Sequence, residues 1–459
     1  MSKLNNYIRM PLGRRGLAAV AAGVVSLAMA LPAAAEPTKF EFWYGVTGPL
    51  SDTVQQMCTN FNKSQSDFQI VCVSHGDYAQ NFQDLIAAYR ANKQPTLGQE
   101  NEITTGTMLL SGAVVPAQKM ITDAGYKIDW NNYLPAVRAY YQTSKGELYS
   151  MPFNSSTAVL YWNQDAFAKI GKDKAPATWE EAHDDAVALK KAGYDCPIAL
   201  DISSDAVWQD MEQFLFAHGE PVATKDNGYN GLDAQVVFNK SAKFVKFISD
   251  LKAWTDEGTV VLKNAKAGES TTAAFAAGHC QMEFESVASH SGIGKTAAPD
   301  MHWSTAVLPI YAGTERHNAV VGGASIWVLK GKSEAEYKGA AAFLNWLSQP
   351  EQALFWSTNT GYIPVTKTGY DYLVKSGFYD KAPYKGREAA IHALNDSKPA
   401  QYGGIRLLSM PQIRVEVGNA FAAIFSGKTP VQQALDEAAQ RSNDDLAKAA
   451  APYKGQAFP

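Results

Sequence analysis

The hydrophobic and polar positions predict short apolar strands that alternate with amphipathic helices. From residue 38 the pattern predicts a strand, a helix, a strand, a helix and a strand, over residues 38–43, 51–61, 68–74, 78–92 and 96–100. Ser51 is expected to cap the first of these helices. This order predicts a parallel sheet with right-handed crossovers, and therefore an α/β fold.

A second α/β unit is predicted after residue 178. Thr178-Trp179-Glu180-Glu181 is a capping box that starts a helix ending at Gly193, and a strand follows at 197–200. Later helices are expected at 241–255 and 271–277, and later strands at 280–284 and 319–329. Helices dominate from Glu334 onward, and the last is expected to use Thr429 as N-cap and Pro430 as its first residue.

Polar side chains stand at the mouth of a buried strand in the stretch 151–163. Its front half contains Asn154, Ser155, Ser156 and Thr157, and its back half is a run of β-branched and aromatic residues. Ligands of open α/β sheets collect at strand ends, so these four residues are predicted to donate hydrogen bonds into a cleft. The alternative is an Asn/Ser turn that feeds a core strand.

The first 35 residues have the pattern of a secretory signal peptide. Basic residues at 3, 9, 14 and 15 precede an apolar run from Leu17 to Leu31 and the small residues 33–35. No cysteine stands directly after the expected cleavage point, which argues against a lipid anchor, and no other stretch reaches the apolar length of a membrane span. Cleavage removes four of the 41 basic residues and none of the 45 acids, so the mature chain has a net charge of 37 − 45 = −8. This negative charge argues against a nucleic-acid partner. About 424 remaining residues exceed what one core supports, so two domains are expected.

Four cysteines in an exported chain suggest disulfides. Three complete pairings are possible. Cys58 with Cys72 and Cys196 with Cys280 is favoured because each pair then lies within one predicted domain, and buried free thiols remain the alternative.

The motifs of common hydrolases and metal sites are missing. The sequence contains no His-Glu-x-x-His, no Gly-x-Ser-x-Gly and no Cys/His cluster at zinc spacing, so no catalytic residue, metal or cofactor is predicted. The stretch 289–296 ends like a phosphate loop but has Ser289 where the first glycine belongs. The loops after the predicted strands still carry hydroxyls, one arginine and backbone amides. Such groups are typical of ligand binding rather than catalysis.

Several motifs resemble a known family. These are PFNSSTAVLYWNQDAF (152–167), NAVVGGASIWVLKGK (318–332), TGYIPVT (360–366), GFYDK (377–381) and GIRLLSMPQIRVEV (404–417). The sequence resembles the periplasmic sn-glycerol-3-phosphate-binding proteins of Ugp ABC importers, within the maltose-binding-protein-like class of extracellular solute-binding proteins. The similarity extends over nearly the whole chain after the signal peptide.

The resemblance implies a two-lobed type II periplasmic solute-binding protein, each lobe a mostly parallel sheet flanked by helices. It implies a monomer that delivers a small phosphorylated solute to permease subunits driven by a cytoplasmic ATPase. The expected division is signal peptide 1–35, lobe 1 at 36–153 plus about 308–365, and lobe 2 at 154–307 plus about 366–459. The implied ligand-binding residues are Tyr78, Glu102, Ser156, Ser286, Gly323, Tyr362 and Arg414. Arginine, hydroxyls and an amide are donors that suit a phosphate, and Glu102 can accept from glycerol hydroxyls.

The sequence departs from the family on one wall of the pocket. Asp205 stands near a family tryptophan, Trp208 matches a second one, Glu283 and Glu285 replace small residues, and Tyr44 replaces a histidine. Loss of an aromatic platform and gain of carboxylates favours a polar or cationic head group, as in a glycerophosphodiester such as glycerophosphocholine. Tyr44, Asp205, Trp208 and Glu285 are therefore the candidate head-group contacts. The alternatives are a binder of a sugar or another phosphorylated solute, and an exported phosphodiesterase.

Overall fold

Two separate sheets organise the described part of the chain, residues 36–398 and 403–459 of a computed structural model. The predicted signal peptide lies outside the described residues. The first sheet contains β1 (Thr38–Tyr44), β2 (Phe68–Ser74), β3 (Leu97–Asn101), β4 (Val114–Val115), β5 (Ser150–Ser156) and β11 (Gly322–Leu329). The second contains β6 (Ala158–Asn163), β7 (Cys196–Leu200), β8 (Val260–Leu262), β9 (Cys280–Ser286) and β10 (Trp303–Ala306).

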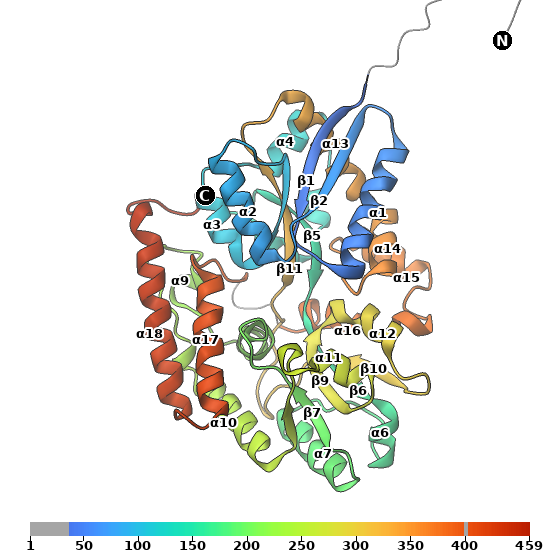
Figure 1. The fold of residues 1–459 in the computed structure, drawn as a ribbon, viewed down its shortest axis with the longest axis vertical. Helices are drawn as coiled ribbons and strands as arrows, with labels where there is room; N and C mark the ends of the chain where they lie inside the picture. The colour runs from blue at the N-terminus through green and yellow to red at the C-terminus, as the bar shows by residue number, and fades with distance from the viewer. Residues whose placement is uncertain (1–35, 399–402) are drawn as a thin grey trace, which may run out of the picture. The chain divides into compact units, whose positions relative to one another are not determined.

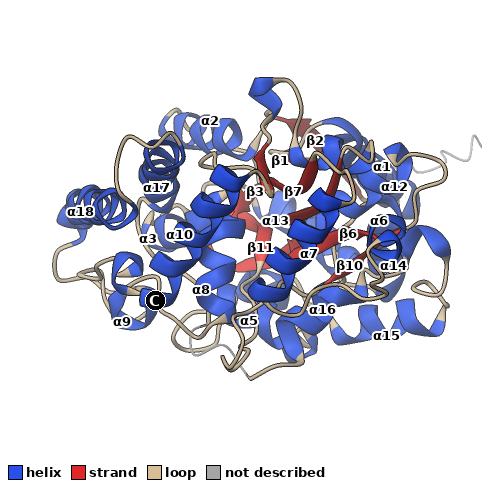
Figure 2. Cartoon of the chain, turned by 90° about the horizontal axis from the view of Figure 1, so that it is seen from below, coloured by secondary structure: helices blue, strands red, loops and turns tan. Residues whose placement is uncertain are grey.

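Helices cover both sheets, so the strands lie in the interior (Figure 2). Those that follow or pack near the first sheet are α1 (Gly48–Ser64), α2 (Tyr78–Arg90), α3 (Thr105–Leu110), α4 (Ala117–Asp123), α5 (Pro135–Tyr141), α13 (Glu334–Leu347) and α14 (Pro350–Asn359). Those near the second are α6 (Gln164–Lys169), α7 (Trp179–Lys191), α8 (Phe214–Ala217), α10 (Ala242–Glu257), α11 (Thr271–Ala276), α12 (His290–Thr296) and α16 (Glu388–Asn395), and the short α9 (Thr224–Asn227) lies apart from this sheet (Figure 1). The remaining helices are α15 (Lys367–Lys375), α17 (Met410–Phe425) and α18 (Val431–Ala450), of which α17 and α18 pack side by side (Figure 1).

Both sheets are mixed, which corrects the prediction of mostly parallel sheets. The opening strands are parallel as predicted, since β1 pairs in parallel with β2 and β3, and β7 pairs in parallel with β8 and β9. However, β11 is antiparallel to β3, β4 and β5, and β6 is antiparallel to β9 and β10. The antiparallel strands flank the crossings between sheets: β5 leaves the first sheet, β6 enters the second, and β11 returns to the first.

Local signals placed most element boundaries correctly. The Thr178 capping box is present, and Ser241, expected as the first residue of a helix, is the N-cap of α10. Two helix starts were wrong: α1 begins at Gly48 after Thr47 rather than at Ser51, and Pro430 is the N-cap of α18 rather than its first residue. Pro49 supports the earlier start of α1, because its fixed φ suits the first turn of a helix.

Both favoured disulfides are confirmed. Cys58 bonds to Cys72, linking α1 to β2, and Cys196 bonds to Cys280, linking β7 to β9. Each disulfide therefore stabilises a different sheet.

Candidate ligand-binding site

The chain crosses from the first sheet to the second at Thr157, the single residue between β5 and β6. Its hydroxyl oxygen lies 3.0 Å from Gln213 Oε1 and 3.1 Å from the Val320 carbonyl oxygen, so the two acceptors share its one proton. Gln213 Nε2 also donates to the Val320 carbonyl, at 2.8 Å. Because Val320 lies on the return path between β10 and β11, one buried glutamine joins two crossings.

Asn154 and Thr157 use their side chains inside the protein, which corrects the prediction that they donate into a cleft. Asn154 Nδ2 donates to the Tyr78 hydroxyl at 2.7 Å, and its Oδ1 accepts from Gln99 Nε2 at 2.8 Å. Asn154, Ser155, Ser156 and Thr157 are all buried. Asn154 therefore orients a predicted ligand residue, Tyr78.

Tyr78 and Tyr362 bring two phenols together at the first sheet. Their hydroxyl oxygens are 3.5 Å apart, and the Tyr362 ring stacks on Trp356 with centroids 5.9 Å apart. Burial raises the pKa of both phenols. Tyr362 raises the pKa of Tyr78 further, whereas the hydrogen bond with Tyr78 lowers the pKa of Tyr362. Both hydroxyls are therefore neutral at physiological pH and can donate to an anion.

Arg414 lies between two buried carboxylates that come from different lobes. Its Nε and Nη2 donate to Glu212 at 2.7 and 3.0 Å, and Nη2 also donates to Glu102 at 2.8 Å. Glu102 follows β3 of the first sheet, Glu212 lies in a short π-helical segment, η3 (Trp208–Gln213), after β7 of the second, and Arg414 is on α17. The side chains of Arg414, Glu102 and Glu212 are 11%, 3% and 1% exposed.

The charges of this cluster shift one another's protonation. Burial opposes the charge of Arg414, yet Glu212 and Glu102 raise its pKa above the usual range. Burial raises the pKa of Glu102 to about 7, because the lowering by Arg414 is smaller and the charge of Glu212 raises it further. Arg414 is therefore always charged, while Glu102 is poised to exchange a proton near neutral pH.

Gly323 has a backbone conformation that only glycine adopts easily. Its φ is +108°, and a Cβ there would lie 2.0 Å from the Asn154 carbonyl oxygen. Its N–H donates to Glu102 Oε2 at 3.2 Å. The glycine thus brings its amide beside the arginine cluster.

Ser156 and Ser286 flank the crossing at Thr157. Ser156 ends β5 opposite Gly322, and Ser286 ends β9 opposite Ala158. The Ser286 hydroxyl accepts from the Ala288 N–H at 3.1 Å, so a lone pair is used but its proton can still be donated.

The second sheet carries a group of acids near Ser286. Glu285 accepts from the Ser286 N–H at 2.6 Å and from Gln209 Nε2 at 3.1 Å, and burial raises its pKa to about 7. Burial, with Asp201 and Glu285 nearby, raises the pKa of Asp210, and burial together with Glu285 raises that of Glu283. These acids favour a neutral form or a cationic partner.

The candidate head-group residues do not all lie together. Asp205 is exposed on the wall of a pocket, and Trp208 is buried with its indole against Gly322. Tyr44 lies in the core of the first sheet, with its hydroxyl bonded to Ser51 and Gln55. The structure therefore does not bring Tyr44 to the other candidate head-group residues.

A pocket of about 720 Å³ opens beside Arg414. Its walls come from α2, the end of β3, the loop before η3 and the start of α17, and among the predicted residues it includes Tyr78, Asp205 and Arg414. Such a volume suits a small solute. Elements far apart in the sequence thus meet at one opening.

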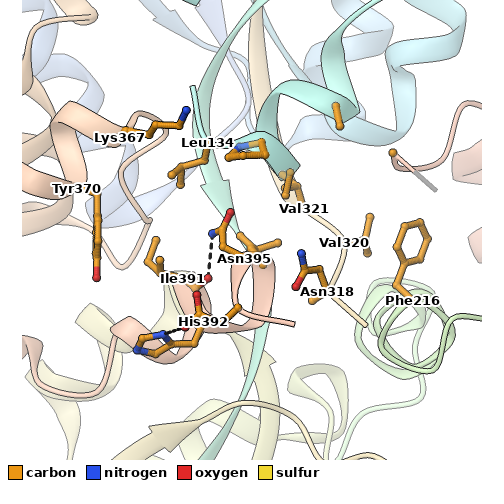
Figure 3. Close-up of a pocket in the computed structure, with 17 residues that line it drawn as sticks. Leu134, Phe216, Asn318, Val320, Val321, Lys367, Tyr370, Ile391, His392 and Asn395 are labelled. Carbon is orange, nitrogen blue, oxygen red and sulfur yellow. Dashed lines mark hydrogen bonds and ion pairs between the residues drawn. The ribbon is translucent and has the colours of Figure 1, made fainter. Parts of the chain in front are cut away.

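A second pocket, of about 650 Å³, contains none of the predicted ligand residues (Figure 3). Leu134, Val320, Val321 and Ile391 make it mainly apolar, and Asn395 donates to the Ile391 carbonyl rather than into the space. Its charged lining residues are Lys367, His392 and Asp396, of which His392 and Asp396 are paired with each other.

Glu212, Gln99, Gln209 and Gln213 were not predicted from the sequence. Each is a polar residue whose importance depends on a partner distant in sequence, and no local motif marks it. Within the described ranges, no His, Cys, Asp and Glu side chains gather as a metal site would require. The helices described there include none that is long and apolar enough to span a membrane.

Two α/β lobes joined by crossings, with polar groups from both at one opening, define a solute-binding protein. The family model for bacterial extracellular solute-binding proteins matches residues 56–383. The chain belongs to this family, and within it to the sn-glycerol-3-phosphate-binding periplasmic proteins.

The relatives support this placement over nearly the full length. The sn-glycerol-3-phosphate-binding periplasmic protein UgpB of Pectobacterium atrosepticum is 38% identical over 96% of this chain and 97% of its own. The protein of that name from Escherichia coli strain K12 is 37% identical over 93% of this chain and 96% of its own. The crystal structure of UgpB from Mycobacterium tuberculosis in complex with glycerophosphocholine has a TM-score of 0.74 and 19% identity over 90% of this chain and 99% of that one, which shows the shared fold.

Proposed function

We propose that this chain captures sn-glycerol-3-phosphate or a glycerophosphodiester, such as glycerophosphocholine, between its lobes and delivers it to an ABC permease. The observation that carries the proposal is the buried Arg414 at the edge of a solute-sized pocket, bonded to carboxylates from both lobes. A neutral sugar does not need such a cation, whereas a phosphate does. The relatives that share nearly the whole chain carry sn-glycerol-3-phosphate binding in their names.

The proposed contacts divide by chemistry. Arg414, the hydroxyls of Tyr78 and Tyr362, and the hydroxyls of Ser156 and Ser286 donate to the phosphate. Glu102 accepts from glycerol hydroxyls, and the Gly323 amide, now bonded to Glu102, donates to the ligand when Glu102 turns toward it. These groups hydrogen-bond a phosphate and a glycerol directly, and the proposal includes no cofactor or metal.

The head group is proposed to lie toward the second sheet. Glu285 is held by Gln209 and lies beside Asp201 and Asp210, so a trimethylammonium or ammonium group there gains a partner. Asp205 reaches the same ligand from the pocket wall, and Trp208 supports the backbone at Gly322 rather than stacking on glycerol. Tyr44 takes no part.

The remaining parts of the proposal concern the whole molecule. Residues 1–35 act as a signal peptide that directs the chain to the periplasm. Lobe 1 comprises 36–153 and about 308–365, and lobe 2 comprises 154–307 and about 366–459. The protein works as a monomer, meets the permease subunits with its ligand enclosed, and catalyses no reaction.

Calorimetry with four ligands tests this function: sn-glycerol-3-phosphate, glycerophosphocholine, glycerophosphoethanolamine and maltose. Binding of at least one phosphorylated ligand and no binding of maltose is expected. Tight binding of maltose alone would instead support the sugar-binding alternative.

The phosphodiesterase alternative is tested separately. Purified protein is incubated with glycerophosphocholine, with and without divalent metals, and free choline is measured. No release is expected, and turnover that survives repurification would overturn the assignment as a binding protein.

A further inference from the structure

Arg414 offers a ligand only part of its guanidinium group. Its three recorded hydrogen bonds use Nε and Nη2, and Nη1 donates to no residue in the described part of the chain. Glu212 takes the Nε–Nη2 edge with both of its oxygens, which is the paired geometry that a phosphate would otherwise use. A ligand that leaves this bond intact can reach only Nη1.

The same cluster also limits the charge that the site can accept. Arg414 with ionised Glu102 and Glu212 carries +1 − 2 = −1, and all three side chains are nearly buried. Water therefore screens their charges weakly, and each further negative charge is costly. A phosphate monoester is close to doubly charged above pH 7, because its second pKa is about 6, whereas a phosphodiester carries one charge.

We infer that Glu212 is a positioning residue that sets the charge selectivity of the cleft: by holding Arg414 it favours a singly charged phosphodiester over a doubly charged phosphate monoester. The inference rests on the proposed function and adds a residue to it. Glu212 does not need to touch the ligand, because it acts through the orientation and the net charge of Arg414.

Entry of a doubly charged ligand then requires a proton. Glu102 is the group placed to take it, since burial raises its pKa to about 7. Besides Arg414 and Glu212, the titratable groups near enough to interact with the charge of Glu102 are the phenols of Tyr78 on α2, Tyr140 and Tyr141 on α5, and Tyr362, and burial together with that charge raises the pKa of each phenol. The exposed Asp205 shares the pocket wall with Arg414 and adds a further negative charge. A monoester is thus expected to bind with proton uptake and a diester without it.

The test compares two ligands with the same glycerol and phosphate, sn-glycerol-3-phosphate and glycerophosphoglycerol. The second is a diester with an uncharged head group. It therefore has no cation that could interact with the acids of the second sheet. Calorimetry at pH 7.5 gives the ratio of the two Kd values for the wild type and for Glu212→Gln. The ratio of monoester to diester Kd is expected to fall about tenfold in the variant, as the site loses one negative charge.

Glu416→Gln is the matched control. Glu416 lies on the same helix as Arg414 and pairs with Arg441 instead, so this variant changes the net charge of the protein equally without touching the cluster. Its ratio is expected to equal that of the wild type. An unchanged ratio in Glu212→Gln, with both ligands still bound, would overturn the inference and leave the proposed function standing.

Proton uptake by the wild type is a second measurement that does not depend on how the variant folds. Calorimetry of both ligands in buffers of different ionisation enthalpy is expected to show uptake with the monoester only. Equal uptake with both ligands would overturn the inference. If neither ligand binds the wild type, the inference fails, and binding of glycerophosphocholine then decides whether the proposed function stands.

Discussion

The ends of the two sheets differ in how completely their polar groups are bonded. At the first sheet, Gln99, Asn154 and Tyr78 form a chain of neutral groups at 2.8 and 2.7 Å, and Tyr362 lies next to it. At the second sheet, Glu285 and Asp210 are acids whose pKa values burial raises. The acid at the first end, Glu102, is paired with Arg414, whereas Glu285 accepts from the neutral Gln209 amide and a backbone N–H, so the second end holds an electrostatic cost that a cation would relieve.

The difference indicates a division of labour. A preorganised set of donors suits an anion that is common to every ligand of the class, because its geometry never changes. A set of poorly compensated acids suits the part of the ligand that varies. The following predictions test this division, from the largest expected effect to the smallest.

Removal of Arg414 is expected to affect the common anion site most. Loss of one member of a buried charge cluster costs about 3 to 5 kcal/mol, so Arg414→Ala should weaken every phosphorylated ligand by roughly several hundred-fold or more. Calorimetry measures the loss. Arg441→Ala, which removes a surface arginine paired with Glu416, is the control and should change little. Unchanged affinity in Arg414→Ala would remove this residue from the site.

The acid end is expected to make stability depend on pH. The pKa of Glu285 is raised from 4.5 to about 7, so between these values the folded chain keeps a proton that the unfolded chain has lost. The free energy of unfolding therefore falls as pH rises through this window, by about 3 kcal/mol, and levels off above it. Glu285→Gln should unfold at higher denaturant concentration than the wild type at pH 8 and at the same concentration near pH 4.

The matched control for Glu285 is Glu437→Gln, which removes an exposed carboxylate on α18. It should leave the pH dependence unchanged.

The same Glu285→Gln variant should weaken binding of glycerophosphocholine more than that of sn-glycerol-3-phosphate, by about 1 to 3 kcal/mol. Equal losses for both ligands would show that Glu285 does not read the head group.

The two disulfides allow the sheets to be weakened one at a time. They span 14 and 84 residues, and the chain-entropy model assigns loops of these lengths about 3 and about 4.5 kcal/mol. Denaturant unfolding of the double variants Cys58→Ala/Cys72→Ala and Cys196→Ala/Cys280→Ala should therefore differ by about 1.5 kcal/mol, with the second less stable. Equal losses would mean that loop length does not set their contribution.

The smallest effect is expected from Tyr362→Phe. The variant keeps the ring that stacks on Trp356 and loses one neutral hydroxyl, which costs about 1 kcal/mol of binding, or roughly fivefold in Kd. Tyr370→Phe, in the apolar pocket of Figure 3, is the control and should bind normally. A loss much larger than tenfold would mean that the phenol orders its neighbours as well.

Local chemistry explains which features could be predicted from the sequence. The Thr178 capping box, the alternating pattern of β1 and β2 and the pairing of the cysteines each depend on nearby residues or on domain membership. The antiparallel placement of β11 depends on the path of the chain back from the other lobe, which no local pattern encodes.

The candidate site shows the same limit. Arg414 could be singled out because its motif is distinctive, but its partner Glu212 lies 202 positions away, in a short π-helical segment that no motif marks. Tyr44 was misplaced for a related reason: the strand pattern does not tell whether a residue near the end of β1 points to the core or to the opening. Its buried ring contact with Phe42 belongs to the core.

The bond network around Gln213 has a mechanical consequence. Two chain crossings that were free of each other could bend or twist separately, and the lobes would then have two independent soft modes. Because Thr157 and Gln213 bond to the same Val320 carbonyl, and Thr157 bonds to Gln213 as well, both crossings deform together. We therefore expect these two crossings to act as one joint rather than as two independent hinges when the lobes move relative to each other.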